Sequence, residues 1–281
     1  MSDATGVRAS ASRAREGAPA DGSERISAAF AARRRRAALM PYLMGGYPSL
    51  EHSLQIGEAC IGAGADLLEV GVPYSDPLAD GPVIHEAGTQ ALAAGADVAG
   101  VLEVVRALAP HIPVVLMCYA NMVLAPGAEA FMDRLARTGA SGLIVPDVPL
   151  EESHALLQAA DEVGIALVPL VAPTTPRERF AHIAAGARGF LYAVSVVGTT
   201  GERAALPHRF TDVVARAKES TELPVALGFG ISTAEHARQA ADAGADGVII
   251  GTRLVRAAGE SEDPAAAVAD VLAGIARGLE P

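Results

Sequence analysis

The chain has 281 residues, 51% of them hydrophobic and 4% aromatic, which is enough for one large α/β barrel or two ordinary domains. Its net charge of −11 argues against general nucleic-acid binding, and no apolar run reaches the length of a membrane span. The sequence shows no basic segment followed by an apolar one, which is the pattern of a secretory signal peptide, so we expect a cytoplasmic protein.

The N-terminal region divides into a polar tail and a short helix. Residues 1–22 contain almost nothing to bury, so we expect a disordered tail ahead of a single domain at 23–281. Residues 24–36 are predicted to be helical because Ile26 and Phe30 can share one face. The basic run at 33–36 could be an anion or RNA patch, but a solvated helix end that complements the helix dipole is favoured.

Eight apolar runs then alternate with helical patterns. The apolar runs are 38–44, 66–72, 113–118, 142–145, 165–171, 190–194, 225–227 and 247–250. The helical patterns are 50–63, 86–94, 98–109, 127–138, 151–163, 177–185, 208–219, 233–243 and 263–278. Strands that are apolar throughout are typical of parallel strands covered on both faces. We therefore predict an α/β fold, a single (β/α)8 TIM barrel with an extra N-terminal helix. A doubly wound sheet is the alternative, but it would require a glycine-rich loop after the first strand.

One strand and the loop after it carry three carboxylates. Glu69 lies inside the apolar run 67–72, and Asp76 and Asp80 follow Pro73 on the loop. A carboxylate buried in a strand is unfavourable unless it has a partner or a function, and further carboxylates on the next loop suit acid–base chemistry. The alternative for Glu69 is a structural ion pair.

Glycines follow the last two strands, at the end of a barrel where active sites form. In Gly228-Phe229-Gly230-Ile231-Ser232 and in Gly251-Thr252, backbone N–H groups could approach a phosphate near a helix start. Either segment alone could be an ordinary turn, but both together favour a phosphate site. The loop 195–202 could be a lid or simply a long loop. No cluster of residues has metal-ligand spacing, so no metal is expected.

The run from Leu68 to Pro82 resembles the signature of the tryptophan synthase alpha chain family. The segments 119–121, 147–149, 195–201 and 228–232 also match, and the resemblance covers residues 38–257. It implies a lyase that cleaves indole-3-glycerol phosphate to indole and glyceraldehyde 3-phosphate in L-tryptophan biosynthesis.

The resemblance also implies the roles of individual residues. Glu69 would be the catalytic acid and base, with a raised pKa, and Asp80 would stay ionised and accept the indole N–H. The substrate would be contacted by Tyr192, Tyr42, Met117, Tyr119, Ile144, Pro146 and Thr200. Its phosphate would be held by Gly201, Gly228, Gly230, Gly251 and Thr252.

The family further implies a partner, a pyridoxal-phosphate-dependent beta chain in an αββα heterotetramer. Asp76, Asn121 and Pro149 match the contact region. The chain itself is expected to need no cofactor. One rival is another phosphosugar barrel enzyme, which would lack the run from Glu69 to Asp80. A second rival is a non-catalytic subunit that only activates the beta chain, which loss of either carboxylate would indicate.

Overall fold

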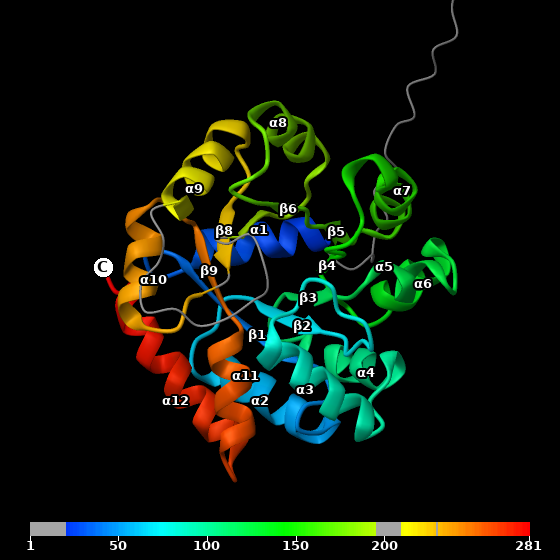
Figure 1. The fold of residues 1–281 in the computed structure, drawn as a ribbon, viewed down its shortest axis with the longest axis vertical. Helices are drawn as coiled ribbons and strands as arrows, with labels where there is room; N and C mark the ends of the chain where they lie inside the picture. Colours follow the sequence, from blue (N-terminus) through cyan, green and yellow to red (C-terminus); the bar gives the residue numbers. More distant parts are fainter. Residues whose placement is uncertain (1–20, 195–208, 229) are drawn as a thin grey trace, which may run out of the picture.

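The computed structural model describes residues 21–194, 209–228 and 230–281, so most of the predicted tail and the loop at 195–202 lie outside it. Its centre is a curled, parallel, nine-stranded sheet in the order β5-β4-β3-β2-β1-β9-β8-β7-β6 (Figure 1). The strands are β1 (Ala38–Met44), β2 (Leu68–Gly71), β3 (Val114–Met117), β4 (Gly142–Ile144), β5 (Ala166–Leu167), β6 (Leu170–Val171), β7 (Leu191–Val194), β8 (Val225–Gly228) and β9 (Gly247–Ile250).

The two edge strands of this order, β5 and β6, are halves of the predicted fifth strand. Pro169 lies between them, and it has no N–H to donate to a ladder. Backbone bonds nevertheless continue on both sides, from Val168 N to Leu143 O at 2.9 Å and from Tyr192 N to Pro169 O at 3.1 Å. Both edges therefore belong to one chain segment, which closes the barrel and confirms the predicted TIM fold.

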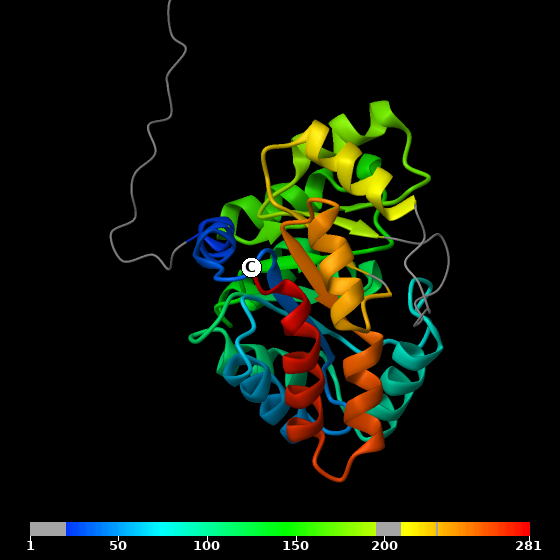
Figure 2. The same cartoon turned by 90° about the vertical axis from the view of Figure 1, so that its left-hand side faces the viewer.

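Helices surround the sheet, as Figures 1 and 2 show. They are α2 (Leu50–Gly62), α3 (Pro82–Ala93), α4 (Val98–Leu108), α5 (Ala120–Leu124), α6 (Ala128–Ala136), α7 (His154–Val163), α8 (Arg177–Gly186), α9 (Arg209–Ser220), α10 (Ala234–Asp242), α11 (Thr252–Glu260) and α12 (Pro264–Ala276), with 3-10 turns η1 (Leu150–Glu152) and η2 (Arg277–Leu279). Helices α5 and α11 were not predicted from the sequence. The second of these buries Leu254, Val255, Ala257 and Ala258 at helical spacing.

The strands separate two apolar layers. Met40, Val115, Ile144, Phe190 and Ile249 belong to the layer inside the barrel. The alternate strand positions pack outward against the helices in a second, larger layer. Since successive side chains of a strand point to opposite faces, a residue's place in the chain decides which layer it enters.

The predicted N-terminal helix is α1 (Gly22–Ala32), and it covers one end of the barrel (Figure 2). Ile26 and Phe30 are buried in the inner layer, and the Phe30 ring lies 5.8 Å from that of Phe190. The Arg25 guanidinium donates to the carbonyl of Gly139 at 2.6 Å. The helix begins at Gly22, so the boundary predicted between residues 22 and 23 falls inside it.

The basic run at 33–36 was expected to be the solvated end of this helix, and this interpretation holds only for Arg33. The helix ends at Ala32 with Arg33 as its C-cap, and the Arg33 guanidinium donates to the carbonyl of Phe30 at 2.5 Å. Three of the four arginines also reach carboxylates on other elements. Arg33 lies 3.9 Å from Asp246, Arg35 lies 4.0 Å from Asp66, and Arg36 lies 2.6 Å from Asp242. The run therefore ties the start of the domain to the end of the barrel that α1 covers.

Gly22 provides a test of how tightly α1 is seated. Its N–H donates to Gly164 O at 2.8 Å, and an added Cβ would lie 1.9 Å from the carbonyl oxygen of Ser141. We expect Gly22→Ala to lower the free energy of unfolding by about 2 kcal/mol or more, measured by urea denaturation.

The matched control is Gly62→Ala at the end of α2, where an added Cβ would meet nothing within 4 Å. This change should raise stability by roughly 0.5 kcal/mol because alanine loses less entropy than glycine in a helix. Equal stability of Gly22→Ala and the wild type would contradict the tight packing of α1.

Candidate active site

Four of the predicted substrate residues meet inside the barrel. Tyr42, Met117, Ile144 and Tyr192 are all buried in the inner layer. Glu69 is paired in register with Tyr42 on one side and with Val115 on the other. The strands thus bring together side chains that lie up to 150 positions apart in the sequence.

Glu69 is buried without an ion-pair partner among the described residues, and one of its carboxyl oxygens has no hydrogen bond there. Its neighbours Leu68 and Val70 pack in the outer layer, so Glu69 itself points into the barrel. The residue is 2% exposed, and its Oε2 atom has no hydrogen-bond partner among the described residues. Burial, with a smaller contribution from the charge of Asp80, raises the pKa of Glu69 to about 8. The carboxyl group is therefore protonated at neutral pH, and the ion pairs of the described chain do not include it.

Asp80 lies on the loop after β2 and is less deeply buried. Burial raises the pKa of Asp80, whereas a hydrogen bond from the Tyr119 hydroxyl and the nearby His85 lower it. Glu69 carries the larger shift of the two carboxyl groups. When two neighbouring carboxyl groups lie in different environments, their pKa values differ, so that one can act as a neutral acid while the other is ionised.

Tyr119 fixes the loop that carries Asp80. Its hydroxyl accepts from the backbone N–H of Ala79 at 3.0 Å and donates to the Asp80 carboxylate. Its ring stacks on that of Tyr74, with 5.1 Å between centroids and 26° between planes. Sequence reasoning missed Tyr74, because nothing in the order of residues shows which aromatic ring a loop tyrosine will face.

Two glycines make room for the tyrosine rings. A Cβ at Gly71 would lie 2.1 Å from the Tyr42 hydroxyl, and one at Gly228 would lie 2.4 Å from the Tyr192 ring. Burial is the main cause that raises the pKa of both tyrosines, with smaller contributions from Asp80 and then Glu69 at Tyr42 and from Glu69 at Tyr192. Both phenols are therefore neutral hydrogen-bond donors. Gly71 was not singled out from the sequence, and Gly228, predicted to bind phosphate, has this additional role.

The predicted phosphate residues that the structure describes follow neighbouring strands. Gly228 ends β8, and Gly230 beyond it has a φ of +94°, which glycine adopts readily. Gly251 follows β9 and immediately precedes α11, whose first residue is Thr252. Thr200, Gly201 and the rest of the predicted lid lie outside the described residues.

The residues predicted to contact a partner are all on the surface. Asp76, Asn121 and Pro149 are exposed. Close to the last two, the Asp147 carboxylate accepts from Ala120 N at 2.8 Å and so ties the start of α5 to the loop after β4.

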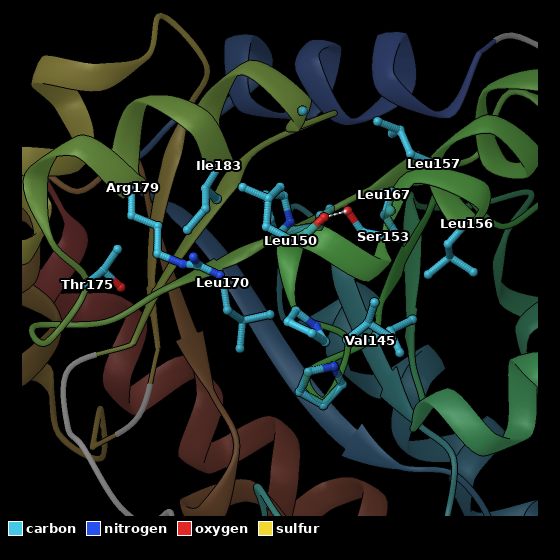
Figure 3. Close-up of a pocket in the computed structure, with 16 residues that line it drawn as sticks. Val145, Leu150, Ser153, Leu156, Leu157, Leu167, Leu170, Thr175, Arg179 and Ile183 are labelled. Carbon is cyan, nitrogen blue, oxygen red and sulfur yellow. Dashed lines mark hydrogen bonds between the residues drawn. The ribbon is translucent and has the colours of Figure 1, made fainter.

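An apolar cavity of about 220 Å³ lies between α7 and α8, outside the break in the fifth strand (Figure 3). Pro146 and Leu170 line it, so it shares a wall with the predicted indole contact at Pro146. The bidentate ion pair of Arg179 with Glu151, at 2.6 and 2.8 Å, lies at its edge. Glu69 and Asp80 do not line this cavity.

The described part of the chain contains no group of three or more His, Cys, Asp and Glu side chains that could hold a metal ion. It also contains no helix that is long and apolar enough to cross a membrane.

Comparison with known proteins gives consistent matches over nearly the whole chain. A family model described as the tryptophan synthase alpha chain matches residues 29–280. The alpha chain of Synechococcus elongatus is 50% identical over 234 residues, covering 82% of this chain and 88% of the relative. That of Cyanothece sp. is 44% identical over 262 residues, covering 91% and 98%.

Solved structures agree with these matches. A structure of Mycobacterium tuberculosis tryptophan synthase has a TM-score of 0.85 at 37% identity, covering 92% of this chain and 98% of that chain. A structure of the tryptophan synthase α2β2 complex from Pyrococcus furiosus has a TM-score of 0.81 at 34% identity, covering 86% and 98%.

The Glu69→Gln variant tests the burial of the Glu69 carboxyl group, and this test needs no substrate. The folded state holds the Glu69 proton more tightly than the unfolded chain does, with a pKa of about 8 against the usual 4.5. The stabilisation is therefore complete below pH 4.5 and is lost as the pH rises to about 8. Relative to Glu69→Gln, the wild type should lose up to about 5 kcal/mol over this range, measured by urea unfolding.

Glu103→Gln is the control, because Glu103 is exposed on α4 and pairs only with Arg106 among the described side chains. If the difference in free energy of unfolding between the wild type and Glu69→Gln does not vary with pH, the Glu69 carboxyl is not buried without a partner.

Proposed function

The chain belongs to the tryptophan synthase alpha chain family of tryptophan biosynthesis, and on this premise we propose that it is a lyase acting on indole-3-glycerol phosphate. The reaction is a retro-aldol cleavage that gives indole and glyceraldehyde 3-phosphate. The observation that carries the proposal is the burial of Glu69 inside the barrel, where its Oε2 atom has no hydrogen-bond partner among the described residues and its pKa is raised by burial and by Asp80.

Glu69 supplies and recovers one proton. Its neutral carboxyl gives a proton to C3 of the indole ring, which leaves positive charge on the ring and a buried carboxylate. That carboxylate takes the hydroxyl proton from the adjacent side-chain carbon. The carbonyl of the aldehyde forms as the C–C bond breaks, and the bond's electron pair returns to the ring to give neutral indole. Glu69 ends protonated, as it began.

Asp80 stabilises the charge that develops in this sequence. Its carboxylate accepts the indole N–H, where positive charge accumulates once C3 is protonated. The Tyr119 hydroxyl bond and the Ala79 contact hold the Asp80 loop in place before the substrate binds. The apolar inner layer around Met117 and Ile144 takes the ring and excludes water.

The phosphate binds to backbone N–H groups after β8 and β9. Gly230, Gly251 and Thr252 lie there, and the N-terminus of α11 adds a favourable dipole. Thr200 and Gly201, which the family resemblance assigns to the lid and phosphate, remain predictions.

The partner is a pyridoxal-phosphate-dependent beta chain. The exposed Asp76, Asn121 and Pro149 form the docking region, and the Pyrococcus furiosus relative has been solved as an α2β2 complex. The chain itself acts without a cofactor, in the cytoplasm. A phosphosugar isomerase of the same fold is disfavoured, because such an enzyme would share the phosphate-binding glycines after the last two strands but not the run from Glu69 to Asp80.

Glu69→Gln tests the mechanism directly. Glutamine keeps the shape of the side chain but cannot transfer a proton, so indole release should fall by about 1,000-fold or more. Binding of glycerol 3-phosphate, measured by calorimetry, should stay within roughly threefold of the wild type because the phosphate contacts are elsewhere. Glu103→Gln, an exposed position on α4, is the control that should leave both unchanged.

The assay is run with and without added beta chain. Near-normal turnover by Glu69→Gln would show the mechanism to be wrong. A wild-type chain that stimulates the beta chain but releases no indole in either condition would identify the non-catalytic subunit instead.

Tyr119→Phe tests the support of Asp80. The change removes the hydrogen bond that lowers the pKa of Asp80, so that pKa should rise. Because Asp80 acts in its ionised form, the acid limb of the profile of kcat/KM against pH should move to higher pH. At neutral pH, kcat/KM should fall roughly fivefold or more, as expected for the loss of a hydrogen bond to a charged group.

Tyr74→Phe is the matched control, since it keeps the stacked ring pair and leaves the Asp80 hydrogen bond in place. If both variants had the same pH profile as the wild type, the Tyr119 hydroxyl would have no part in setting the charge of Asp80.

A further inference from the structure

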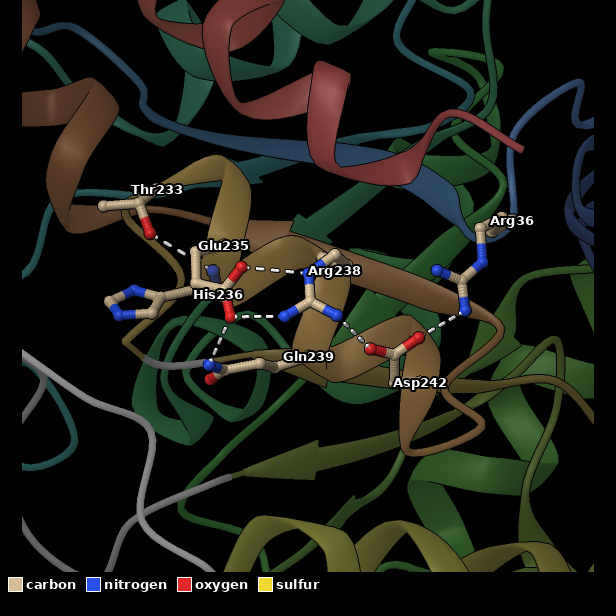
Figure 4. Close-up of polar contacts among 7 residues, drawn as sticks. All are labelled: Arg36, Thr233, Glu235, His236, Arg238, Gln239 and Asp242. Atoms are coloured by element: carbon tan, nitrogen blue, oxygen red, sulfur yellow. Dashed lines mark hydrogen bonds and ion pairs between the residues drawn. The ribbon is translucent and has the colours of Figure 1, made fainter.

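A buried histidine lies behind the turn that follows β8. His236 is 4% exposed and belongs to the first turn of α10, where Figure 4 shows it beside Thr233. Its Nδ1 atom accepts from the backbone N–H of Ser232 at 3.4 Å and lies 3.2 Å from the Ser232 hydroxyl oxygen. His236 is not among the predicted catalytic, substrate-binding or phosphate-binding residues.

The geometry assigns the acceptor in this contact. A backbone N–H can only donate, so Nδ1 is the acceptor in the contact with Ser232 N. The Ser232 hydroxyl then donates to the same Nδ1. The His236 ring thus contacts the backbone N–H and the hydroxyl of a single residue on the turn.

The contact is a variant of a capping box. Thr233 is the N-cap of α10, and its Oγ1 accepts from the backbone N–H of His236 at 3.1 Å. In the usual motif a Glu or Gln at this third helical position reaches back to the N–H of the cap residue. Here a histidine reaches one residue further, to Ser232. The Thr-x-x-His spacing at 233–236 is the sequence signal that could have identified it.

The helix does not depend on this contact. Arg238 pairs with Glu235 at 2.9 Å and with Asp242 at 2.8 Å, and Asp242 in turn pairs with Arg36 at 2.6 Å (Figure 4). The Thr233 cap and the two Arg238 pairs stabilise α10 itself, and the pair of Asp242 with Arg36 joins its end to the segment before β1. What His236 adds is therefore a constraint on the turn before the helix.

That turn is one of the two segments assigned to the phosphate. Gly230 has a positive φ, and the next residue, Ile231, is 3% exposed and packs in the outer apolar layer. Ile231 anchors one side of the turn, and the bonds from Ser232 to His236 anchor the other. Backbone N–H groups bind an anion more tightly when their directions are fixed beforehand, because ordering a mobile turn weakens binding.

We propose that His236 is a positioning residue, which acts through Ser232 to hold the 230–232 turn in the conformation that binds the substrate phosphate. The inference rests on the proposed function, since it concerns the phosphate of the same substrate. A positioning role can be distinguished from a purely structural one. If His236 positions the turn, loss of the Nδ1 acceptor should weaken phosphate binding and raise KM, with kcat nearly unaffected.

Two substitutions distinguish the loss of the Nδ1 acceptor from the loss of the imidazole ring. His236→Leu keeps a buried side chain of similar bulk but removes the acceptor. His236→Asn places Oδ1 the same number of bonds from the backbone as Nδ1, so it can accept from Ser232. The dissociation constant of glycerol 3-phosphate and the KM for indole-3-glycerol phosphate should rise roughly five- to tenfold in the leucine variant. Both should stay within about twofold of the wild type in the asparagine variant.

Asp97→Ala is the control for a general loss of stability. It removes the N-cap of α4, where Asp97 accepts from Gly100 N at 2.7 Å, on a side of the barrel away from α10 (Figure 1). Asp97→Ala should lower the free energy of unfolding by the amount that is usual for the loss of an N-cap, and it should leave KM unchanged. If His236→Leu does not fold, His236→Ala takes its place in the comparison.

Wild-type affinity in the leucine variant would overturn the proposal. So would equal weakening in the leucine and asparagine variants, because the ring and not the acceptor would then matter. A wild-type chain that binds glycerol 3-phosphate but releases no indole would refute the proposed reaction, while the affinities of the variants would still decide the role of His236.

Discussion

The burial of one carboxyl group, that of Glu69, is the constraint on which the site depends. The strand places it in the apolar interior of the barrel, where Oε2 has no partner among the described residues. An ionised carboxylate there would lose its hydration without a compensating bond, so the neutral acid is favoured at neutral pH. The same burial makes the carboxylate a strong base once its proton has been transferred. One environment thus gives the residue both of its chemical roles.

The barrel can hold such a group because its other parts are rigid. The strand pairing continues past the break at Pro169, and α1 covers the end opposite the site. Around Glu69, the rings of Tyr42 and Tyr192 fit against glycines that no larger residue could replace without displacing them. Close packing of this kind keeps water away from the carboxyl, and loss of that packing would return its pKa toward the ordinary range.

The sequence was sufficient for the strands, their parallel arrangement and the two carboxylates. Continuous apolar runs mark parallel strands, and Glu69 is conspicuous inside one of them. Contacts between distant segments could not be predicted. The partners of Arg33, Arg35 and Arg36 are up to 213 residues away, so the run was taken for a solvated helix end. Helix α11 was missed because Gly251-Thr252 was interpreted only as a phosphate turn. His236 was missed because it stands where a capping box usually has Glu or Gln.

The pKa of Glu69 in the folded chain is the measurement that tests this account most directly. It can be followed by NMR of a 13C-labelled glutamate carboxyl, assigned with Glu69→Gln, in the wild type and in Asp80→Asn. The account predicts that the wild-type group titrates at about 8 and that Asp80→Asn lowers the value, since a neighbouring negative charge is removed. A Glu69 carboxyl that titrates near its usual value of 4.5 would contradict the account.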